Sequence, residues 1–458
     1  MQDALAGAWQ ALAGDPGATP PAVSLTGEES VLPGHFRIPA MATASIAAAT
    51  LSAGELLRLR GIEPGTVSVD TRHAAAAFRS EQLLRIDGEP APSPWGRIAG
   101  DYRASDGWIK LHCNTPRHEA AVCWSLGVPA VRDSVAKTVA AKTVAEVESA
   151  VVTAGGAAAF MRSREDWLAH PQGQAVAGLP LVELNRIGDA PKRTLFDSDR
   201  PMGGVRVLEL THVLAGPVAG RVLAAHGANV LHIGAVHLPR IPMLTMDTGQ
   251  GKRSAFVALD TEGGRAKLKK LIARADVLVQ SFRPGALARM GLGPEQLAEL
   301  RPGLVVADIS AYGWQGPWAR RRGFDSLVQM SSGIAQEYAD DAPAPLPAQA
   351  LDHATGWLTA AAVMTAVRRS VQEGGSWHAR LSLAGTGRWL DSLGRKDPEP
   401  SEVDFSDLLE TVDSDFGRMT RVRMAGELPG AQPYWDHASH RPGADTAVWS
   451  PIVPHPVA

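Results

Sequence analysis

The feature that most constrains the fold is a run of short apolar strands that alternate with helices between residues 201 and 310. The expected strands are rich in Val, Leu and Ile and cover 204–210, 228–234, 276–282 and 304–310. Segments with a helical pattern separate them, at 218–227, 263–275 and 294–302. Apolar strands that alternate with helices are typical of a parallel sheet covered on both faces. The sequence therefore predicts the α/β class, with a Rossmann-like, doubly wound parallel sheet.

Length and charge limit the classes of function. The chain has 458 residues and a formal net charge of -3, so charge does not favour nucleic acid or an anionic membrane as a partner. The apolar stretch 40–53 is shorter than the roughly 20 residues of a membrane span, and we interpret it as a packed helix. We therefore expect a chain of two or three domains, with neither a nucleic-acid nor a membrane partner.

The two cysteines, Cys113 and Cys123, match neither a zinc pattern nor a disulfide framework. We expect two thiols in a reducing compartment and no metal site. The N-terminus lacks a positively charged start before its apolar run, so we expect no signal peptide and a cytoplasmic location.

Composition shifts divide the chain into five expected parts. Residues 1–38 are rich in Pro and Gly and are interpreted as a covering segment or a loosely docked arm. Residues 396–458 are expected to form a C-terminal wrap with a short strand near 419–425. The full expectation is an arm at 1–38, a helical repeat at 39–90, a smaller α+β domain at 91–195, the Rossmann-like domain at 196–395 and the wrap at 396–458.

An internal repeat links two distant segments. The segment that starts at Asp352 matches the segment that starts at Ala42, 352 − 42 = 310 positions earlier, with a one-residue gap after the turn. Both copies run from a small-residue helix with a basic end, through a Gly turn, into a strand and a second helix. Because Ala42 stands where the second copy has Asp352, we interpret the first copy as degenerate.

Local motifs taken alone predict little chemistry. The segment 216–221 (GPVAGR) lacks the glycine spacing of a dinucleotide fingerprint, and 249–254 (GQGKRS) is a Gly-rich turn that is not a Walker A loop. Arg283 ends an expected strand, where parallel sheets bind ligands. Together these motifs favour an anion near the sheet edge, and solvated surface cations remain the alternative.

Five blocks in order carry a resemblance to a known family. They cover LELTHVLAGPVAGRVLAAHGANV, GKRSAFVALDTEGGRAKL, ADVLVQSFRPGALARMGLG, the stretch from LRPGLVVADIS to GFDSLVQMSSGIA, and LDHATGWLTAAAVMTAV. In order and spacing, residues 201–392 resemble the class III CoA-transferases. The resemblance implies the class III CoA-transferase fold and transfer of coenzyme A between carboxylic acids.

The N-terminal half resembles the same family in a different order. The segments 100–113 and 159–188 are similar to the family's smaller domain, which usually follows the large one. Here they precede it. The chain is interpreted as circularly permuted or as a fusion that lost one large domain, and the repeat favours the fusion.

Asp352 matches the family's catalytic aspartate. The resemblance implies that its carboxylate attacks an acyl-CoA thioester, forms a mixed anhydride and then an aspartyl-CoA thioester, and that a carboxylic acid reverses the steps. Asp352 also heads an expected helix, whose N-terminal dipole favours a negative charge. From position alone, a simple helix N-cap remains the alternative.

The resemblance also implies which residues bind the substrate. Lys252, Arg253 and Arg283 fall on motifs near the CoA phosphates, and cationic side chains suit phosphate. Gly216 and Pro217 shape the loop after the first strand, and His212 lies in that loop. Acyl-CoA and a small carboxylic acid are the expected partners, with no tightly bound cofactor. A homodimer, the family's usual assembly, is left open.

Departures from the family pattern narrow the activity. Phe324 holds the position at which related racemases have a His, and phenylalanine cannot act as a base. Leu214 replaces a Gln of the formyl-CoA transferases, which weighs against oxalate or formate. The segment 232–239 (HIGAVHLP) lacks the usual acidic residue, so the adenosine contacts are not carried over. A non-catalytic CoA-binding homologue and an acyl-CoA isomerase of the same superfamily remain alternatives.

Overall fold

A seven-stranded sheet organises the body of the molecule in this computed structural model, which describes residues 1–238, 240–398 and 403–451. The strand order is β11-β10-β9-β12-β13-β14-β8. The first six strands are parallel, and β8 pairs antiparallel with β14. The bounds are β8 Glu183–Gly188, β9 Arg206–Leu210, β10 Asn229–Gly234, β11 Lys252–Phe256, β12 Val277–Gln280, β13 Val305–Ser310 and β14 Ser376–Ser382. The doubly wound α/β fold expected from the sequence is confirmed.

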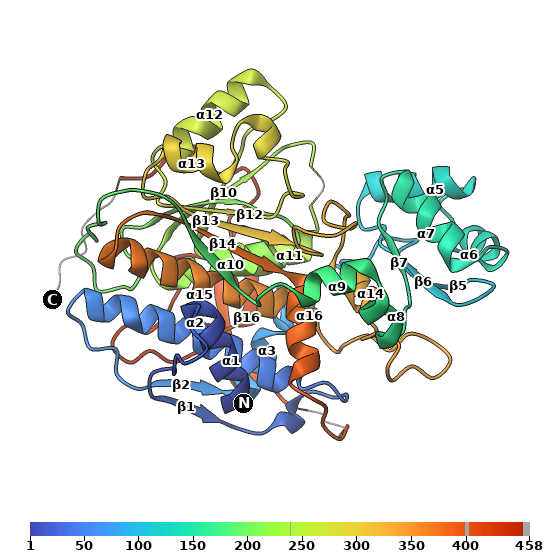
Figure 1. Ribbon diagram of the computed structural model, residues 1–458, viewed down its shortest axis with the longest axis horizontal. Coiled ribbons are helices and arrows are strands. Elements are labelled where there is room, and N and C mark those ends of the chain that lie inside the picture. The colour runs from blue at the N-terminus through green and yellow to red at the C-terminus, as the bar shows by residue number, and fades with distance from the viewer. Residues whose placement is uncertain (239, 399–402, 452–458) are drawn as a thin grey trace.

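Helices cover both faces of this sheet. In Figure 1, α12 (Glu262–Ile272) and α13 (Pro294–Leu300) lie above the sheet, and α10 (Ala215–Ala225) and α15 (Ala350–Gln372) lie below it. Successive strand residues divide between the two cores: Leu208 packs with the α12 side and Val207 with the α10 side. This alternation follows from the two-residue period of a strand. It explains why the strands show no polar face in the sequence.

The sheet contains one topological switch point. β9 lies between β10 on one side and β12 on the other, so the loops that leave β9 and β12 diverge above a crevice. Open α/β sheets bind ligands at this point, beyond the carboxyl ends of the strands. The loop 211–214 and the segment 281–285 therefore frame the expected site.

Two elements differ from the sequence-based expectation for this sheet. Lys252 and Arg253 were expected in a Gly-rich turn, but they lie on the edge strand β11. The segment that contains β8 was assigned to the smaller domain, but it completes the large sheet beside β14. Both strands carry several polar side chains, which concealed their extended pattern.

A smaller lobe stands beside the body and has its own core (Figure 1). It contains the strands β5 Gly100–Arg103, β6 Trp108–Leu111 and β7 Ala158–Phe160, with the helices α5 Pro116–Leu126, α6 Arg132–Ala140 and α7 Val144–Thr153. The chain returns to the body through α8 (Arg164–Ala169) and α9 (Pro171–Ala177).

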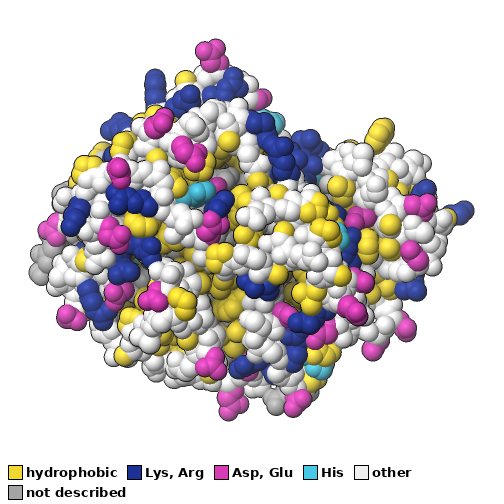
Figure 2. Space-filling model, in the orientation of Figure 1, with side chains coloured by type: hydrophobic (Ala, Val, Ile, Leu, Met, Phe, Trp, Pro, Cys, Tyr) yellow, Lys and Arg dark blue, Asp and Glu magenta, His cyan; other side chains and the backbone are white. Residues whose placement is uncertain are grey.

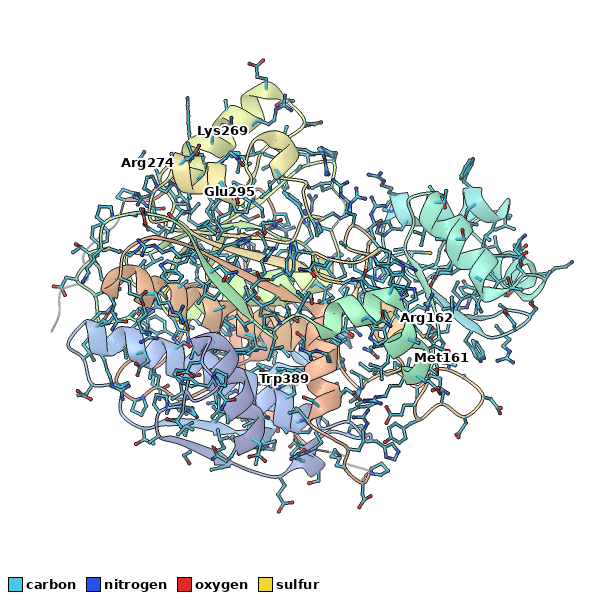
Figure 3. All side chains as sticks on the ribbon, viewed as in Figure 1. Met161, Arg162, Lys269, Arg274, Glu295 and Trp389 are labelled. Carbon is cyan, nitrogen blue, oxygen red and sulfur yellow. The ribbon has the colours of Figure 1, made fainter. Side chains whose placement is uncertain are left out.

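A buried ion-pair network joins the smaller lobe to the body. Glu148 of α7 pairs with Arg162 at 2.9 Å and with Arg321 of the body at 2.9 Å. Figure 3 shows Arg162 at this junction, beside α8 and α14 (Asp325–Ser331). Because all three side chains are largely buried, the pairs fix the lobe more firmly than surface ion pairs would.

The N-terminal part packs more closely than expected. Residues 2–13 form helix α1, which buries Leu5 and Leu12 against α2 (Ile38–Leu59). Of the two interpretations of residues 1–38, the packing of α1 on α2 agrees with a covering segment and not with a loosely docked arm. The following elements are β1 Val23–Thr26, η1 Glu29–Val31, β2 Val67–Asp70, α3 Thr71–Ala77 and α4 Ser80–Leu83.

The internal repeat is visible as structure and is longer than the sequence indicated. α2, β2 and α3 follow one another as α15, β14 and α16 (Leu383–Ser392) do. In addition, β1 pairs with β2 in parallel, as β13 pairs with β14. We define the degenerate copy from here on as residues 23–83, which include the leading strand β1 and the short helix α4 that follows α3.

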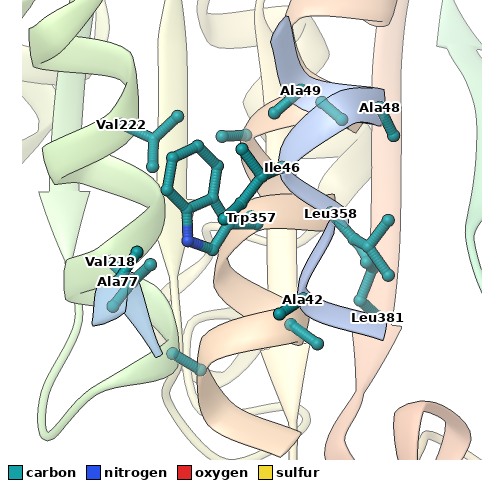
Figure 4. Close-up of a cluster of buried hydrophobic side chains, with 14 of the residues drawn as sticks. Ala42, Ile46, Ala48, Ala49, Ala77, Val218, Val222, Trp357, Leu358 and Leu381 are labelled. Atoms are coloured by element: carbon teal, nitrogen blue, oxygen red, sulfur yellow. The ribbon is translucent and has the colours of Figure 1, made fainter. Parts of the chain in front are cut away.

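Helix α2 is, by length and composition, the one described helix that could cross a membrane, but 94% of its apolar window is buried inside the molecule. Figure 4 shows Ile46 and Ala49 of α2 facing Trp357 of α15, with Val218 and Val222 of α10 on the other side of the indole. The expectation of a packed helix is confirmed. The helix is longer than the apolar stretch from which it was inferred.

The C-terminal segment closes the body from outside. β15 (Leu409–Ser414) and β16 (Gly417–Val422) form a sheet with β3 (Arg85–Ile86) and β4 (Glu89–Pro90). The described residues after 422 contain no further helix or strand and run over the body as irregular coil with turns. The remaining short elements are α11 Pro242–Thr248, η2 Ala288–Met290 and η3 Ser406–Leu408.

Candidate active site

Asp352 lies in the first turn of α15, where two helix N-termini meet. Its side chain is almost completely buried, and the backbone N–H of Ala215, the first residue of α10, lies against its carboxylate. Gly356 permits this approach, because a Cβ there would lie 2.6 Å from the Ala215 carbonyl oxygen. Free N–H groups at helix N-termini stabilise negative charge. The fold therefore prepares a place for an oxyanion at Asp352.

A second carboxylate stands beside Asp352. Asp325, the first residue of α14, accepts a hydrogen bond at 2.9 Å from the backbone N–H of Asp352 through its Oδ2. Gln329 donates to the other oxygen of the same carboxylate. Asp325 therefore caps α15 from a neighbouring helix. Burial raises the pKa of Asp325 to about 6, although the hydrogen bond from Asp352 opposes this shift.

The pKa of Asp352 is raised well above its ordinary value. Burial is the main cause, and the negative charges of Asp325 and Glu81 add to it, while the Ala215 N–H works in the opposite direction. A carboxylate with a raised pKa is a stronger base and nucleophile once it is ionised. The surroundings of Asp352 thus favour nucleophilic chemistry over a passive structural role.

Behind Asp352 lies a buried network that reaches the degenerate copy. Glu81 of α4 lies 2.9 Å from His353, and Ser80 donates to Asp247 of α11 at 2.8 Å. Arg221 of α10 pairs with the same Asp247 at 2.7 Å. Burial raises the pKa of Glu81, but the charge and hydrogen bond of His353 outweigh it and leave the pKa lowered.

The loop between β9 and α10 is strained and tightly packed. Val213 adopts φ +70°, which is unfavourable for a β-branched residue. Gly216 lies against Thr211, whose side chain would be 2.5 Å from a Cβ there. The backbone N–H of His212 donates to Ser281 at 3.2 Å, which joins the two loops at the switch point. Burial lowers the pKa of His212 to about 4, so its ring is neutral at pH 7.

The ammonium group of Lys252 is buried inside the body, where it contacts Glu209 and Pro217. It lies 2.7 Å from Glu209 and donates to the carbonyl of Pro217 at 2.6 Å. Lys252 therefore braces the first turn of α10, and a phosphate could reach it only by displacing Glu209. Arg253 donates to the carbonyl oxygens of Thr446 and Val448 in the C-terminal segment.

A cavity of about 100 Å³ lies beside the loop that starts α10. The residues that line it include His212, Pro217 and Lys252, together with Thr115 of the smaller lobe. Asp352 does not line this cavity, but Ala215, which contacts its carboxylate, is two residues from Pro217. The first turn of α10 therefore borders the cavity through Pro217 and contacts the Asp352 carboxylate through Ala215.

Exposed arginines gather between the body and the smaller lobe. Arg283, Arg289 and Arg320 line a cavity of about 340 Å³, and the guanidinium groups of Arg289 and Arg320 approach Gly285. The charges of Arg283 and Arg117, the latter from α5, act on Arg322, whose pKa is lowered by burial and by these neighbours. Figure 2 shows dark blue side chains at the notch beside the lobe. Within the described ranges, Arg117, Arg283, Arg289 and Arg320 make no ion pair. The group suits a polyanion.

The structure brings together some of the residues singled out from the sequence. Asp352, Gly216, Pro217 and His212 lie around the start of α10, and Arg283 lies in the arginine group. Sequence reasoning missed Asp325, Glu81, Arg289 and Arg320. Asp325 directly follows Phe324, and the acidic residue beside that position was a signal that could have been used. No group of three metal-binding side chains occurs among the described residues.

Comparisons with known proteins identify the region that holds this site. The model of CoA-transferase family III matches residues 202–392. An acetyl-coenzyme A transferase of Hypoxylon pulicicidum is 26% identical over 411 residues, which cover 78% of this chain and 68% of that protein. A probable fatty acyl-CoA transferase of Mycobacterium tuberculosis is 35% identical over 190 residues, which cover 38% of this chain and 48% of that protein.

Solved structures match a smaller part of this chain than the Hypoxylon pulicicidum protein does. The crystal structure of the Mycobacterium tuberculosis protein has a TM-score of 0.40 and 30% identity, covering 42% of this chain and 59% of that one. The chain thus spans about half the length of this relative. The family match coincides with the five blocks, with the switch point and with Asp352. Residues 202–392 therefore form a CoA-transferase family III region, and the relatives that resemble this chain support an enzyme with CoA-transferase activity.

Proposed function

We propose that this enzyme transfers coenzyme A from an acyl-CoA to a small carboxylic acid through covalent intermediates on Asp352. The Asp352 carboxylate attacks the thioester carbonyl carbon, and the C–S bond breaks. CoA departs as its thiolate, and a mixed anhydride forms between Asp352 and the acyl group. The thiolate then attacks the Asp352 carbonyl and releases the donor carboxylate. An acceptor carboxylate attacks the resulting aspartyl-CoA thioester, and the same steps in reverse deliver the new acyl-CoA and free Asp352.

The observation that carries this proposal is the place of Asp352 at the junction of α10 and α15. The N–H of Ala215 stabilises the ionised carboxylate, while burial and Asp325 keep its pKa high. An oxyanion that develops on either carbonyl in the reaction would meet the same uncapped start of α10. Gly356, which lets the two helices approach, supports the arrangement.

The arginine group supplies the binding site for the CoA phosphates in this proposal. CoA carries a diphosphate and a separate phosphate, and each needs cationic partners at the protein surface. Arg283, Arg289 and Arg320 surround a cavity of about 340 Å³ that is open to solvent and close to the smaller lobe. We assign the phosphates to these arginines, and Lys252 and Arg253 to bracing the site.

A non-catalytic CoA-binding role is the second candidate, and one observation favours it. Asp352 is only 6% exposed and lines none of the cavities described above. Transfer therefore requires the strained loop at Val213 to move and open a path from the cavity to Asp352. A binding protein needs no such path.

An exchange assay distinguishes the two candidates. Isotopically labelled CoA esters are incubated with a panel of carboxylic acids, and the label in each acyl-CoA product is followed. We expect exchange in the wild type and loss to background in Asp352→Asn, with Glu373→Gln at the exposed end of the same helix as a matched control. Measurable CoA binding without exchange in the wild type would favour the binding protein.

A further inference from the structure

The degenerate copy contributes buried polar residues directly behind Asp352. Its last helix, α4, carries Ser80 and Glu81, which are 2% and 3% exposed. Neither lies in the part that matches the family model, which begins at residue 202. The copy that lost its own aspartate thus ends at the active site of the intact copy.

Glu81 holds the residue next to the candidate nucleophile. Its Oε2 lies 2.9 Å from Nε2 of His353, which is completely buried. The ring of Phe78 stacks on the His353 imidazole with ring centres 5.3 Å apart. Nδ1 of His353 has no partner among the described residues. The contacts that fix this imidazole therefore come from the degenerate copy.

Ser80 connects the same short helix, α4, to helices α10 and α11 on the other side of the site. Its hydroxyl donates to Asp247 of α11 at 2.8 Å and accepts from Arg221 of α10 at 3.2 Å. Residues 80 and 81 thus join α10, α11 and α15, and two of these helices have their N-termini at Asp352. Burying polar and charged groups costs free energy. If residues 80 and 81 served only for packing, apolar side chains at these positions would give a more stable protein.

The two related helices pack beside each other along their length. α2 contacts α15, and Ser52 lies 3.5 Å from Thr365. Under the shift of 310 positions, Thr365 corresponds to residue 55, only three positions from Ser52. A helix that meets its own copy near equivalent positions has the geometry of a two-fold symmetric interface. Here both partners belong to one chain.

We propose that the degenerate copy is a working part of the active site: it occupies the place of a second subunit against α15, and its Glu81 orients Asp352 by fixing His353. This inference rests on the proposed function. Glu81 is a positioning residue, because it touches His353 and no reacting atom. Fixing the imidazole holds the first turn of α15, and with it the carboxylate, against the start of α10.

The test compares substitutions of Glu81 in the full chain. Because misplacing a nucleophile by about 1 Å costs on the order of 10²-fold in rate, we expect Glu81→Ala to lower kcat by about that factor. The KM for acyl-CoA should stay within about 2-fold, since substrate contacts are unchanged. Glu81→Gln retains the size of the side chain and a hydrogen-bond acceptor, and should recover most of the lost rate.

Ser52→Ala is the matched control, because it also removes a buried contact between the degenerate copy and α15, far from His353. It should turn over like the wild type. Wild-type kcat in Glu81→Ala would overturn the inference. So would a loss of rate that merely follows the melting temperature and appears equally in Ser52→Ala.

A readout that does not depend on turnover separates this inference from the proposed function. In ring-¹⁵N histidine spectra of the wild type, we expect a slowly exchanging Nε2–H signal from His353, assigned with His353→Gln, that disappears in Glu81→Ala. If no acyl-CoA supports exchange but this signal behaves as expected, the proposed function has failed and the contact stands. A spectrum that Glu81→Ala leaves unchanged would overturn the inference itself.

Discussion

At the scale of single residues, the active site is governed by carboxylates placed close together. Asp352 faces Asp325 from α14, Glu81 from α4, and the N–H of Ala215 from α10, and the polar groups behind it are His353, Arg221 and Asp247. Carboxylates that share a buried site raise one another's pKa. The basicity of Asp352 is thus a property of the whole group.

Asp325→Asn tests this coupling. The folded-state pKa of Asp325, about 6, lies above its ordinary value of 3.8, so its contribution to stability is present at low pH and is lost as the pH rises through about 6. The variant, which does not titrate, should therefore gain stability relative to the wild type at pH 8 and not at pH 4. Thermal melting at both pH values measures this.

The same substitution should also change the pH dependence of the reaction. Removing the charge of Asp325 lowers the pKa of Asp352, so the rate of exchange should reach its plateau at a lower pH than in the wild type. Asn can still accept the hydrogen bond from the Asp352 N–H, so the helix cap is retained. An unchanged pH–rate profile would show that Asp325 does not tune the nucleophile.

At the scale of elements, strands with continuous apolar residues were predictable and polar ones were not. β9, β10, β12 and β13 were predicted because both faces of the sheet are covered and both sets of side chains are apolar. β11 begins with Lys, Arg and Ser, which concealed it. Helix α1 was overlooked because the Pro- and Gly-rich residues that follow it dominated the interpretation of the whole arm.

Only those site residues that lie within the ordered family motifs could be predicted from the sequence. Asp352 and the loop 211–217 were predicted from the resemblance of five ordered blocks to one family, and the family match covers the region that contains them. Glu81 meets His353 from 353 − 81 = 272 positions away, and Arg117 reaches the arginine group from another lobe. Such contacts depend on packing between elements, which no local pattern in the sequence reports.

Because Ala42 of α2 stands where the intact copy has Asp352, the effect of restoring an aspartate at position 42 can be predicted. Ala42 is completely buried, and Figure 4 shows it among apolar side chains near Leu358 and Leu381. Ala42→Asp would bury a carboxylate without a partner, which costs about 3–5 kcal/mol. We expect a correspondingly lower free energy of unfolding in urea and no second active site. Wild-type stability would contradict the close packing of α2 on α15.

At the scale of the whole molecule, the body contacts both the smaller lobe and the degenerate copy. The Glu148 network fixes the lobe, and the arginine group lies between the lobe and the body. Helix α2 of the same chain covers one side of α15 along its length. A homodimer would therefore have to use another face.

Light scattering measures the consequence for assembly. Because α2 already covers α15, we expect the mass of one chain, 48.3 kDa, at concentrations at which the enzyme is active. A mass of two chains under those conditions would show that a second copy packs elsewhere. The activity should be independent of protein concentration if one chain is sufficient.

The arginine group should control affinity for CoA and not the chemical step. Each charge-assisted hydrogen bond contributes about 1.5–3 kcal/mol, so Arg283→Ala and Arg289→Ala should each raise the KM for acyl-CoA about 10-fold or more. The value of kcat should change little. Lys269→Ala, on the far helix α12 (Figure 3), is the charge-matched control. Equal effects of all three substitutions on KM would contradict the assignment of the CoA phosphates to the arginine group.

The measurement that tests the central claim most directly is mass spectrometry of the enzyme after brief incubation with acyl-CoA thioesters, acid quench and digestion. We predict a CoA or acyl adduct on the peptide that contains Asp352, and hydroxylamine should convert it to a hydroxamate at that residue. The adduct should be absent from Asp352→Ala and present in Glu373→Gln. An enzyme that exchanges CoA with no adduct at Asp352, or with an adduct elsewhere, would contradict the account.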